Sequence, residues 1–334
     1  MPAQFVSLRC YDNTMLRQRL IFGSLMFAAL GAVLHLDNLL DRFGRQAASV
    51  SDPLPWPGAG VPGLLMMVVF ALLIALAARE LCAVFRAKGV DSGTATIMLS
   101  ALAGFFAMVA MDFGGDAPLH SAALASLLAF VFVAALIAHS FRRQRVDGAI
   151  ASAAAALFSL VYLGLLPGFY LAIRSAHSAW VVAAIIVITK CADSGAYFTG
   201  RLIGRHRLIP WLSPGKTWEG LAGALVAAAL CATLFAWLFN TCGGAGVWAQ
   251  HDGSTHRLWV ERPYRYGAVM FGGAVLGLAG HLGDLIASLL KRDAGIKDSG
   301  STIPGFGGLL DVFDSPVVAA PVAYWLMVLA GRMD

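Results

Sequence analysis

Long apolar stretches recur along the whole sequence, and they constrain the fold more than any other feature. Each is roughly 20 residues long, enough for a helix to cross a hydrocarbon core of about 30 Å. We expect nine such spans, approximately at residues 20–36, 61–78, 94–111, 121–138, 149–173, 179–198, 221–239, 267–290 and 309–330. Apolar residues make up 59% of the chain and charged residues only 13%, unlike a soluble globular domain. The sequence therefore predicts an all-α, polytopic membrane protein.

The distribution of basic residues predicts how the chain is oriented in the membrane. Most of the 24 Lys and Arg residues lie in segments that share one side if the N-terminus is cytoplasmic, the side where such residues accumulate. The net charge of +5 then follows from this bias and from attraction to anionic headgroups, and it gives no reason to expect a nucleic acid. Arg17 and Arg19 precede the first apolar stretch, but eight further spans favour an anchor over a secretory signal. We expect a multi-pass protein of the inner membrane with a cytoplasmic N-terminus.

Polar groups are distributed unevenly between the two halves of the chain. Residues 1–175 carry few charges inside apolar runs, whereas residues 176–334 place charges inside or against these runs. The five cysteines show neither a CxxC pair nor a metal-ligand spacing, so they indicate no disulfide framework. We expect one integral membrane domain over residues 1–334, in which residues 1–175 are scaffold helices. Residues 176–334 would then carry the active site on helices and cytoplasmic loops.

Asp284 is the most informative charge, because apolar residues flank it on both sides. A charged side chain at the centre of a bilayer costs about 2.5 to 3.5 kcal/mol, so an intramembrane carboxylate is a candidate functional group. With helical spacing, His281, Asp284, Ser288 and Lys291 form one polar stripe that leads to the cytoplasmic end. The glycines before and within this stripe predict close packing against a neighbouring helix; they are Gly273, Gly277, Gly280 and Gly283. An ion pair that only joins helices is the alternative interpretation of Asp284.

A charged loop that contains several glycines follows this stripe and ends at two further carboxylates. Its charged residues of interest are, in order, Lys291, Arg292, Lys297, Asp298, Asp311 and Asp314. Because positions i and i+3 share a helix face, Asp311 and Asp314 would lie on one face where the last helix begins. We expect Asp284 to converge with them, since carboxylate oxygens suit Mg²⁺, which takes its remaining ligands from phosphates and water. The lysines and the backbone amides of the loop suit the phosphates, and a solvated charged loop is the alternative.

A second loop, at residues 200–220, lies next to the end of the sixth apolar stretch, which carries Lys190 and Asp193. Its Gly215-Lys216-Thr217 segment resembles part of a phosphate-binding P-loop. The complete P-loop pattern needs a preceding strand and a glycine at the position that Pro210 occupies, so we reject this interpretation.

Two segments of the second half together resemble the bacterial phosphatidate cytidylyltransferases, also called CDP-diacylglycerol synthases. They are DSGAYFTGRLIGRHRLIPWLSPGKTWEG, at 193–220, and GDLIASLLKRDAGIKDSGSTIPGFGGLLDVFDS, at 283–315. The second contains the long pattern S-x-x-K-R-x-x-x-x-K-D, from Ser288 to Asp298. The resemblance implies a reaction in which a lipid phosphate attacks the α-phosphorus of CTP, giving CDP-diacylglycerol and pyrophosphate with Mg²⁺ as cofactor.

The resemblance also implies roles for individual residues. Asp284 and Asp311 match the family's metal-binding aspartates. The residues that match its catalytic, phosphate-handling segment, or lie beside it, are Lys291, Arg292, Lys297, Asp298 and Asp314. Those that match its nucleotide-binding positions are Ser213, Lys216, Thr217, Trp218, Glu219 and Asp193. The implied partners are CTP, phosphatidic acid and the lipid bilayer, and a homodimer is a further expectation.

The chain departs from the family pattern at two positions. Phe306 stands where the family usually has a histidine, and Val312 where it has an arginine, so two side chains able to contact phosphate are missing. Three alternatives therefore stay open. The chain is a CTP-dependent enzyme acting on another lipid or polyprenol acceptor, a transporter with an ion pathway through Lys190, Asp193 and Asp284, or a catalytically weak relative.

Overall fold

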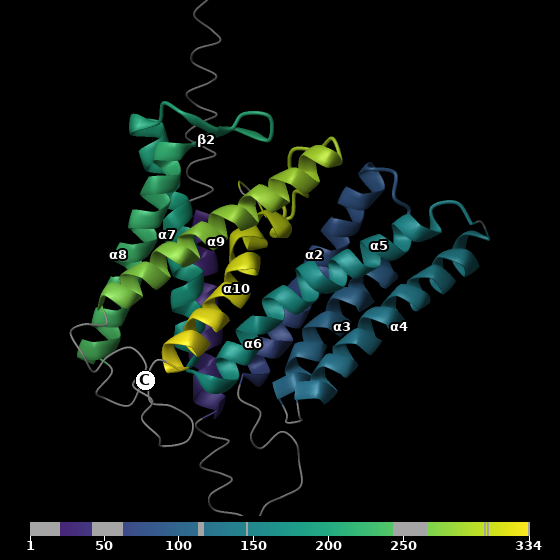
Figure 1. Ribbon diagram of the computed structural model, residues 1–334, viewed down its shortest axis with the longest axis horizontal. Helices are drawn as coiled ribbons and strands as arrows, with labels where there is room; N and C mark the ends of the chain where they lie inside the picture. Colours follow the sequence, from purple (N-terminus) through teal and green to yellow (C-terminus); the bar gives the residue numbers. More distant parts are fainter. Residues whose placement is uncertain are drawn as a thin grey trace, which may run out of the picture.

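The computed structural model describes residues 21–41, 63–112, 117–144, 146–242, 266–303, 305 and 307–332. Within these residues long helices dominate, and one short hairpin joins two of them (Figure 1). Eight of the described helices are long and apolar enough to cross a membrane. A further helix, α3 (Thr94–Asp112), has a shorter described apolar stretch, Thr94–Ala110. The prediction of an all-α, polytopic membrane protein is confirmed, whereas the cytoplasmic N-terminus stays a prediction.

The first half of the chain forms one group of helices. It consists of Ile21–Asp41, α2 (Leu64–Ala87), α3, α4 (Ala117–Arg143), α5 (Ala149–Ser159), the π-helical turn η1 (Leu160–Leu165) and α6 (Leu166–Ala176). The last three follow one another without a break and form the single span Ala149–Ala176. α3 lies in the middle of this group, in contact with α2, α5, η1 and α6.

A buried ion network ties the first helix to this group. Arg174, on α6, donates from Nε to Asp37 Oδ2 at 2.8 Å and also pairs with Asp41. The other oxygen of Asp37 accepts the backbone N–H of Met66 at 3.0 Å. Arg174 and Asp37 are almost completely buried, so each charge offsets a desolvation cost that the other would suffer alone.

The second half forms a group of four helices, α7 (Ala179–Ile203), α8 (Trp218–Cys242), α9 (Tyr266–Asp293) and α10 (Leu309–Arg332). α7 packs against α8, α8 against α9, and α9 against α10. A Cβ added at Gly273 would lie 2.6 Å from the Cβ of Ala232, and one at Gly277 would lie 2.7 Å from that of Ala228. The predicted packing role of these glycines is confirmed, because α8 could not approach so closely otherwise.

Between α7 and α8 the chain forms an antiparallel hairpin of β1 (Arg207–Ile209) and β2 (Ser213–Thr217). The sequence predicted only a loop at this place. The strands are three and five residues long, too short to show a period-two pattern.

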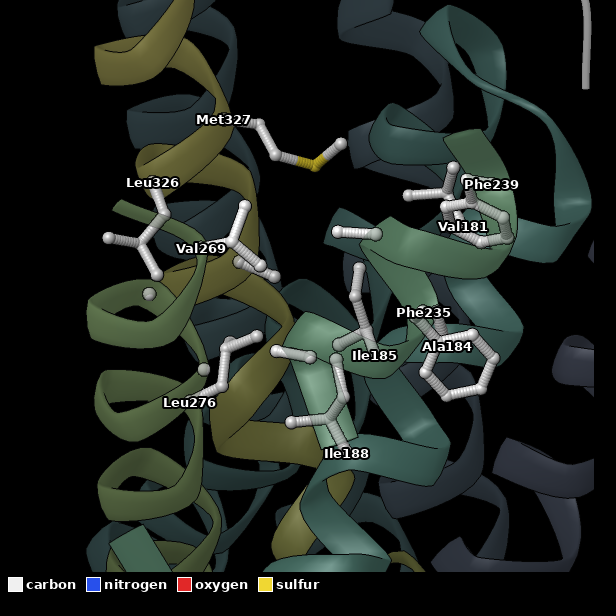
Figure 2. A pocket seen from close by; sticks show the side chains of 15 residues that line it. Val181, Ala184, Ile185, Ile188, Phe235, Phe239, Val269, Leu276, Leu326 and Met327 are labelled. Carbon is white, nitrogen blue, oxygen red and sulfur yellow. The ribbon is translucent and has the colours of Figure 1, made fainter. Parts of the chain in front are cut away.

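An apolar cavity of about 100 Å³ lies between the four helices of the second half (Figure 2). Each helix contributes to its lining, for example with Ile185, Phe235, Leu276 and Met327. These residues come from the ends of α8, α9 and α10 that are remote from the hairpin and from the loop between α9 and α10. The polar chemistry of the second half is therefore confined to the other end of the group.

Candidate active site

The charged residues of the second half gather at one end of the molecule. The end of α9, the start of α10, the hairpin and the end of α2 all lie there (Figure 1). The loop that joins α9 to α10 lies at the same end. Residues that the sequence placed in separate motifs therefore share one region.

Lys216, on β2, reaches from the hairpin to the polar stripe of α9. Its Nζ lies 2.9 Å from Asp284 Oδ2 and donates to the carbonyl oxygen of His281 at 3.4 Å. The lysine side chain is only 13% exposed, so water screens this ion pair weakly. Lys216 and Asp284, which the sequence assigned to one site, are thus in contact.

Asp311, in the first turn of α10, is held through both of its oxygens. Oδ1 lies 2.6 Å from Lys291 Nζ, at the end of α9. Oδ2 accepts the backbone N–H groups of Ser299 and Gly308 at 3.1 and 3.0 Å, and the Ser299 hydroxyl at 3.0 Å. A carboxylate here also complements the positive end of the α10 dipole. The loop between α9 and α10 is therefore folded around Asp311.

Glu80, on α2, supports the same loop from the first half of the chain. Its two oxygens accept the backbone N–H groups of Leu309 and Leu310 at 2.9 and 2.8 Å. These are the first N–H groups of α10, which have no partner within the helix. Oε2 also accepts the Ser299 hydroxyl at 3.2 Å. Glu80 thus caps α10 and helps to fix the position of Asp311.

The sequence analysis did not identify Glu80. The expected span 61–78 ended two residues before it, so Glu80 was counted with a loop, whereas α2 continues to Ala87. A carboxylate inside a longer apolar helix is the signal that could have found it.

A third polar cluster joins α7 to α10. Ser315 donates from Oγ to Asp193 Oδ2 at 3.0 Å, and from its backbone N–H to Asp314 Oδ1 at 2.6 Å. Lys190 Nζ lies 3.2 Å from Asp193 Oδ2 and 3.7 Å from Asp314 Oδ1. Asp314 is only 6% exposed, and the lysine and these hydrogen bonds offset the cost of burying it.

Four carboxylates and three lysines therefore make up the centre of the site. They are Asp193, Asp284, Asp311, Asp314, Lys190, Lys216 and Lys291. Among the residues that the structure describes, no three His, Cys, Asp or Glu side chains gather closely enough to hold a metal ion by themselves. Any ion bound here would need further ligands from elsewhere.

Two of the predicted nucleotide-binding residues hold the hairpin together. Thr217 is buried, and its Oγ1 accepts the backbone N–H of Gly220 at 3.0 Å. Glu219 Oε1 lies 2.7 Å from His206 Nδ1, and Oε2 accepts the backbone N–H of Arg205 at 3.1 Å. Their contacts fix the shape of the segment that presents Lys216, and their contact with a nucleotide stays a prediction.

The remaining predicted residues lie around this centre. Ser213 begins β2, where it pairs with Ile209, and Trp218 is exposed at the start of α8. Three further residues are exposed in or beside the loop after α9, namely Arg292, Lys297 and Asp298. Their roles stay predictions.

The two departures from the family pattern lie in the same loop and in α10. Val312 is half-buried in the first turn of α10. Phe306 lies outside the described residues.

Two buried polar atoms of this region have no hydrogen-bond partner in the described part of the chain. They are Tyr162 Oη, on η1, and His281 Nε2, on α9. The sequence analysis placed His281 on the polar stripe but did not single out Tyr162. Buried polar atoms normally have partners, so each of these asks for an explanation.

Comparisons with known proteins agree with this site. The model of the cytidylyltransferase family matches residues 58–330. Several similar proteins carry the name phosphatidate cytidylyltransferase. One from Bacillus subtilis is 35% identical over 51% of this chain and 56% of its own length. One from Haemophilus influenzae is 36% identical over 43% of this chain and 44% of its own length.

A longer match, at lower identity, covers most of both chains. The phosphatidate cytidylyltransferase of Synechocystis is 30% identical over 80% of this chain and 89% of its own length. The first two matches span only about half the length of those relatives, whereas the family model takes in α2 to α10 and every residue of the centre of the site. The chain belongs to the cytidylyltransferase family.

Proposed function

We propose that this chain is a phosphatidate cytidylyltransferase, which transfers the cytidylyl group of CTP to phosphatidic acid and releases pyrophosphate. The observation that carries the proposal is the meeting of two separate motifs in one place, through the Lys216–Asp284 and Lys291–Asp311 ion pairs. The names of the relatives support the same activity.

The charges of the site suit two anionic substrates. CTP and phosphatidic acid both carry phosphate groups, and the ammonium groups of Lys190, Lys216 and Lys291 lie in this region. A hydrogen bond between an ammonium group and a phosphate oxygen is about twice as strong as one between neutral groups. The lysines are held in place by carboxylates, so they need little rearrangement before phosphate binds.

The reaction needs placement and charge neutralisation more than acid–base chemistry. An oxygen of the lipid phosphate forms a bond to the α-phosphorus of CTP, and the bond from this phosphorus to the oxygen that bridges to the β-phosphate breaks. Pyrophosphate leaves with the electron pair. A phosphate monoester is ionised at neutral pH, so it is already a nucleophile. The lysines would hold the two substrates in line and offset the charge on the leaving group.

A divalent cation fits the donor chemistry of the site. The available ligands are carboxylate oxygens, which Mg²⁺ prefers, and this ion usually takes one or two of them together with phosphates and water. Asp284 and Asp311 are the residues that we propose would hold it. When bound, Mg²⁺ would neutralise phosphate charge next to the reacting phosphorus.

We place the site at the cytoplasmic face of the inner membrane, as the distribution of Lys and Arg predicts. CTP is a soluble nucleotide and phosphatidic acid a membrane lipid, so the two can meet only at a membrane surface. A homodimer stays a prediction.

The direct test is an assay of the purified full-length chain in lipid vesicles. The chain is incubated with CTP, Mg²⁺ and phosphatidic acid, and the liponucleotide product is measured. Polyprenyl phosphate replaces phosphatidic acid in a parallel reaction. Product from phosphatidic acid alone supports the proposal. Product from the polyprenyl phosphate alone would transfer the function to another acceptor, and no nucleotide turnover with either would overturn it.

A further inference from the structure

Tyr162 is a buried residue whose hydroxyl has no partner. Its side chain is 4% exposed, and Oη accepts or donates no hydrogen bond in the described part of the chain. Burying a hydroxyl without a partner costs roughly 1 to 3 kcal/mol by protein mutational data. A phenylalanine would fill the same space without that cost, so the hydroxyl itself needs an explanation.

The backbone around Tyr162 is unusual and rigidly supported. Tyr162 lies in η1, a π-helical turn inside the span Ala149–Ala176. Such turns are uncommon and often occur at functional sites. η1 is in close contact with α3, because a Cβ added at Gly164 would lie 2.9 Å from the Cα of Gly104. The ring of Tyr162 stacks on that of Phe158, with centroids 5.2 Å apart. The place of the hydroxyl is therefore fixed by packing.

The hydroxyl points toward the centre of the site. The carboxylates of Asp314, Asp284 and Asp311 all act on it electrostatically, Asp314 most strongly. None of them accepts its hydrogen. Because a tyrosine hydroxyl is a good donor, it is available to an acceptor that enters the space between these side chains.

A phosphate oxygen is the acceptor that suits this space. It must approach three carboxylates, which repel an anion unless cations neutralise it. The ammonium groups of Lys190, Lys216 and Lys291 supply those cations. A phosphate group can accept hydrogen bonds from the lysines and from the tyrosine together.

We propose that Tyr162 is a substrate-contacting residue that donates a hydrogen bond from Oη to a phosphate oxygen. This inference rests on the proposed function, and the phosphate belongs either to CTP or to phosphatidic acid. The first half of the chain would then contribute directly to the chemistry and not only to the scaffold.

Tyr162→Phe tests the inference, with Tyr170→Phe as a matched control. Tyr170 lies in the same span and is equally buried, but its hydroxyl donates to the Pro316 carbonyl oxygen at 3.0 Å. Both purified full-length variants are compared with the unchanged chain in two measurements. One is the melting temperature without substrate, and the other is kcat and KM for CTP and for phosphatidic acid.

We expect opposite results for the two variants. Tyr162→Phe should melt at the same temperature or higher, because a buried unpaired hydroxyl is removed, while kcat/KM falls about 10- to 100-fold. Tyr170→Phe should melt lower, because a buried hydrogen bond is lost, while kcat/KM stays within about twofold. A rise in the KM for CTP alone would assign the phosphate to the nucleotide, and a rise for phosphatidic acid alone would assign it to the lipid.

The outcomes separate this inference from the proposed function. If the unchanged chain is active and Tyr162→Phe keeps its kcat/KM, the inference is wrong and the function stands. If the unchanged chain makes no product, the function is wrong. The inference is then judged by the rise in melting temperature that CTP with Mg²⁺, or short-chain phosphatidic acid, produces. A smaller rise in Tyr162→Phe with either one supports the contact, and an equal or absent rise with both overturns it.

Discussion

Lys216 Nζ lies 2.9 Å from Asp284 Oδ2, and this ion pair joins the hairpin after α7 to the middle of the polar stripe on α9. Neither residue could be exchanged for a neutral one without leaving the other partly buried and unpaired. The pair therefore serves the fold and the site together. It also separates the present account from one in which the hairpin is a passive connection between two spans.

Replacing Lys216 by Met should reduce activity far more than stability. The variant loses a cation that would contact phosphate, so we expect kcat/KM to fall about 10- to 100-fold, with most of the change in the KM for CTP. Steady-state kinetics on vesicles with phosphatidic acid measure this. Lys88→Met is the control, because Lys88 pairs with Asp293 at 2.7 Å in an ion pair that is 49% and 60% exposed, and such pairs contribute little. Equal kinetics for the two variants would contradict the assignment of Lys216.

Replacing Glu80 by Gln should weaken the start of α10. The amide has one oxygen in place of two, and its NH₂ group would face backbone N–H donors. We expect unfolding to become easier by about 1 to 3 kcal/mol. Because Asp311 loses part of its support, the Mg²⁺ concentration for half-maximal activity should rise. A magnesium titration of the assay measures this shift, and a destabilised variant with an unchanged magnesium requirement would show that Glu80 supports only the fold.

Replacing Arg174 by Met should destabilise the protein without touching the site. The change leaves Asp37 and Asp41 without their cation in a buried place, at a cost of about 3 to 5 kcal/mol. Thermal unfolding in detergent measures the loss. Replacing the two aspartates by Leu as well should restore much of it, because no unpaired charge remains. A single variant as stable as the unchanged chain would contradict the structural role of this network.

The layout of the helices could be predicted from the sequence because lipid leaves few choices for an apolar stretch of about 20 residues. The boundaries could not, since a helix continues past its last apolar residue when a neighbouring chain segment satisfies its polar groups. α2 shows this. It extends from the expected end at residue 78 to Ala87, and in that extension lies Glu80.

The contacts of the site divide in the same way. Asp284, Asp311 and the lysines stood out because charges beside apolar stretches are costly. Their partners did not, because the sequence does not say which lysine reaches which carboxylate. Tyr162 was missed for a further reason. A tyrosine in an apolar stretch is ordinary, and nothing in the sequence indicated the π-helical turn that directs it.

The most direct test of the account is the rate of CDP-diacylglycerol formation by Asp284→Asn and Asp311→Asn, each purified and confirmed as folded by thermal unfolding. Asp293→Asn is the control, since Asp293 lies on the same helix and pairs only with the exposed Lys88 among the described residues. We predict that both site variants lose at least about 100-fold in rate, because each removes a charged ligand from the reacting phosphates, while the control stays near the rate of the unchanged chain. Turnover at the unchanged rate in either site variant would contradict the assignment of these two carboxylates.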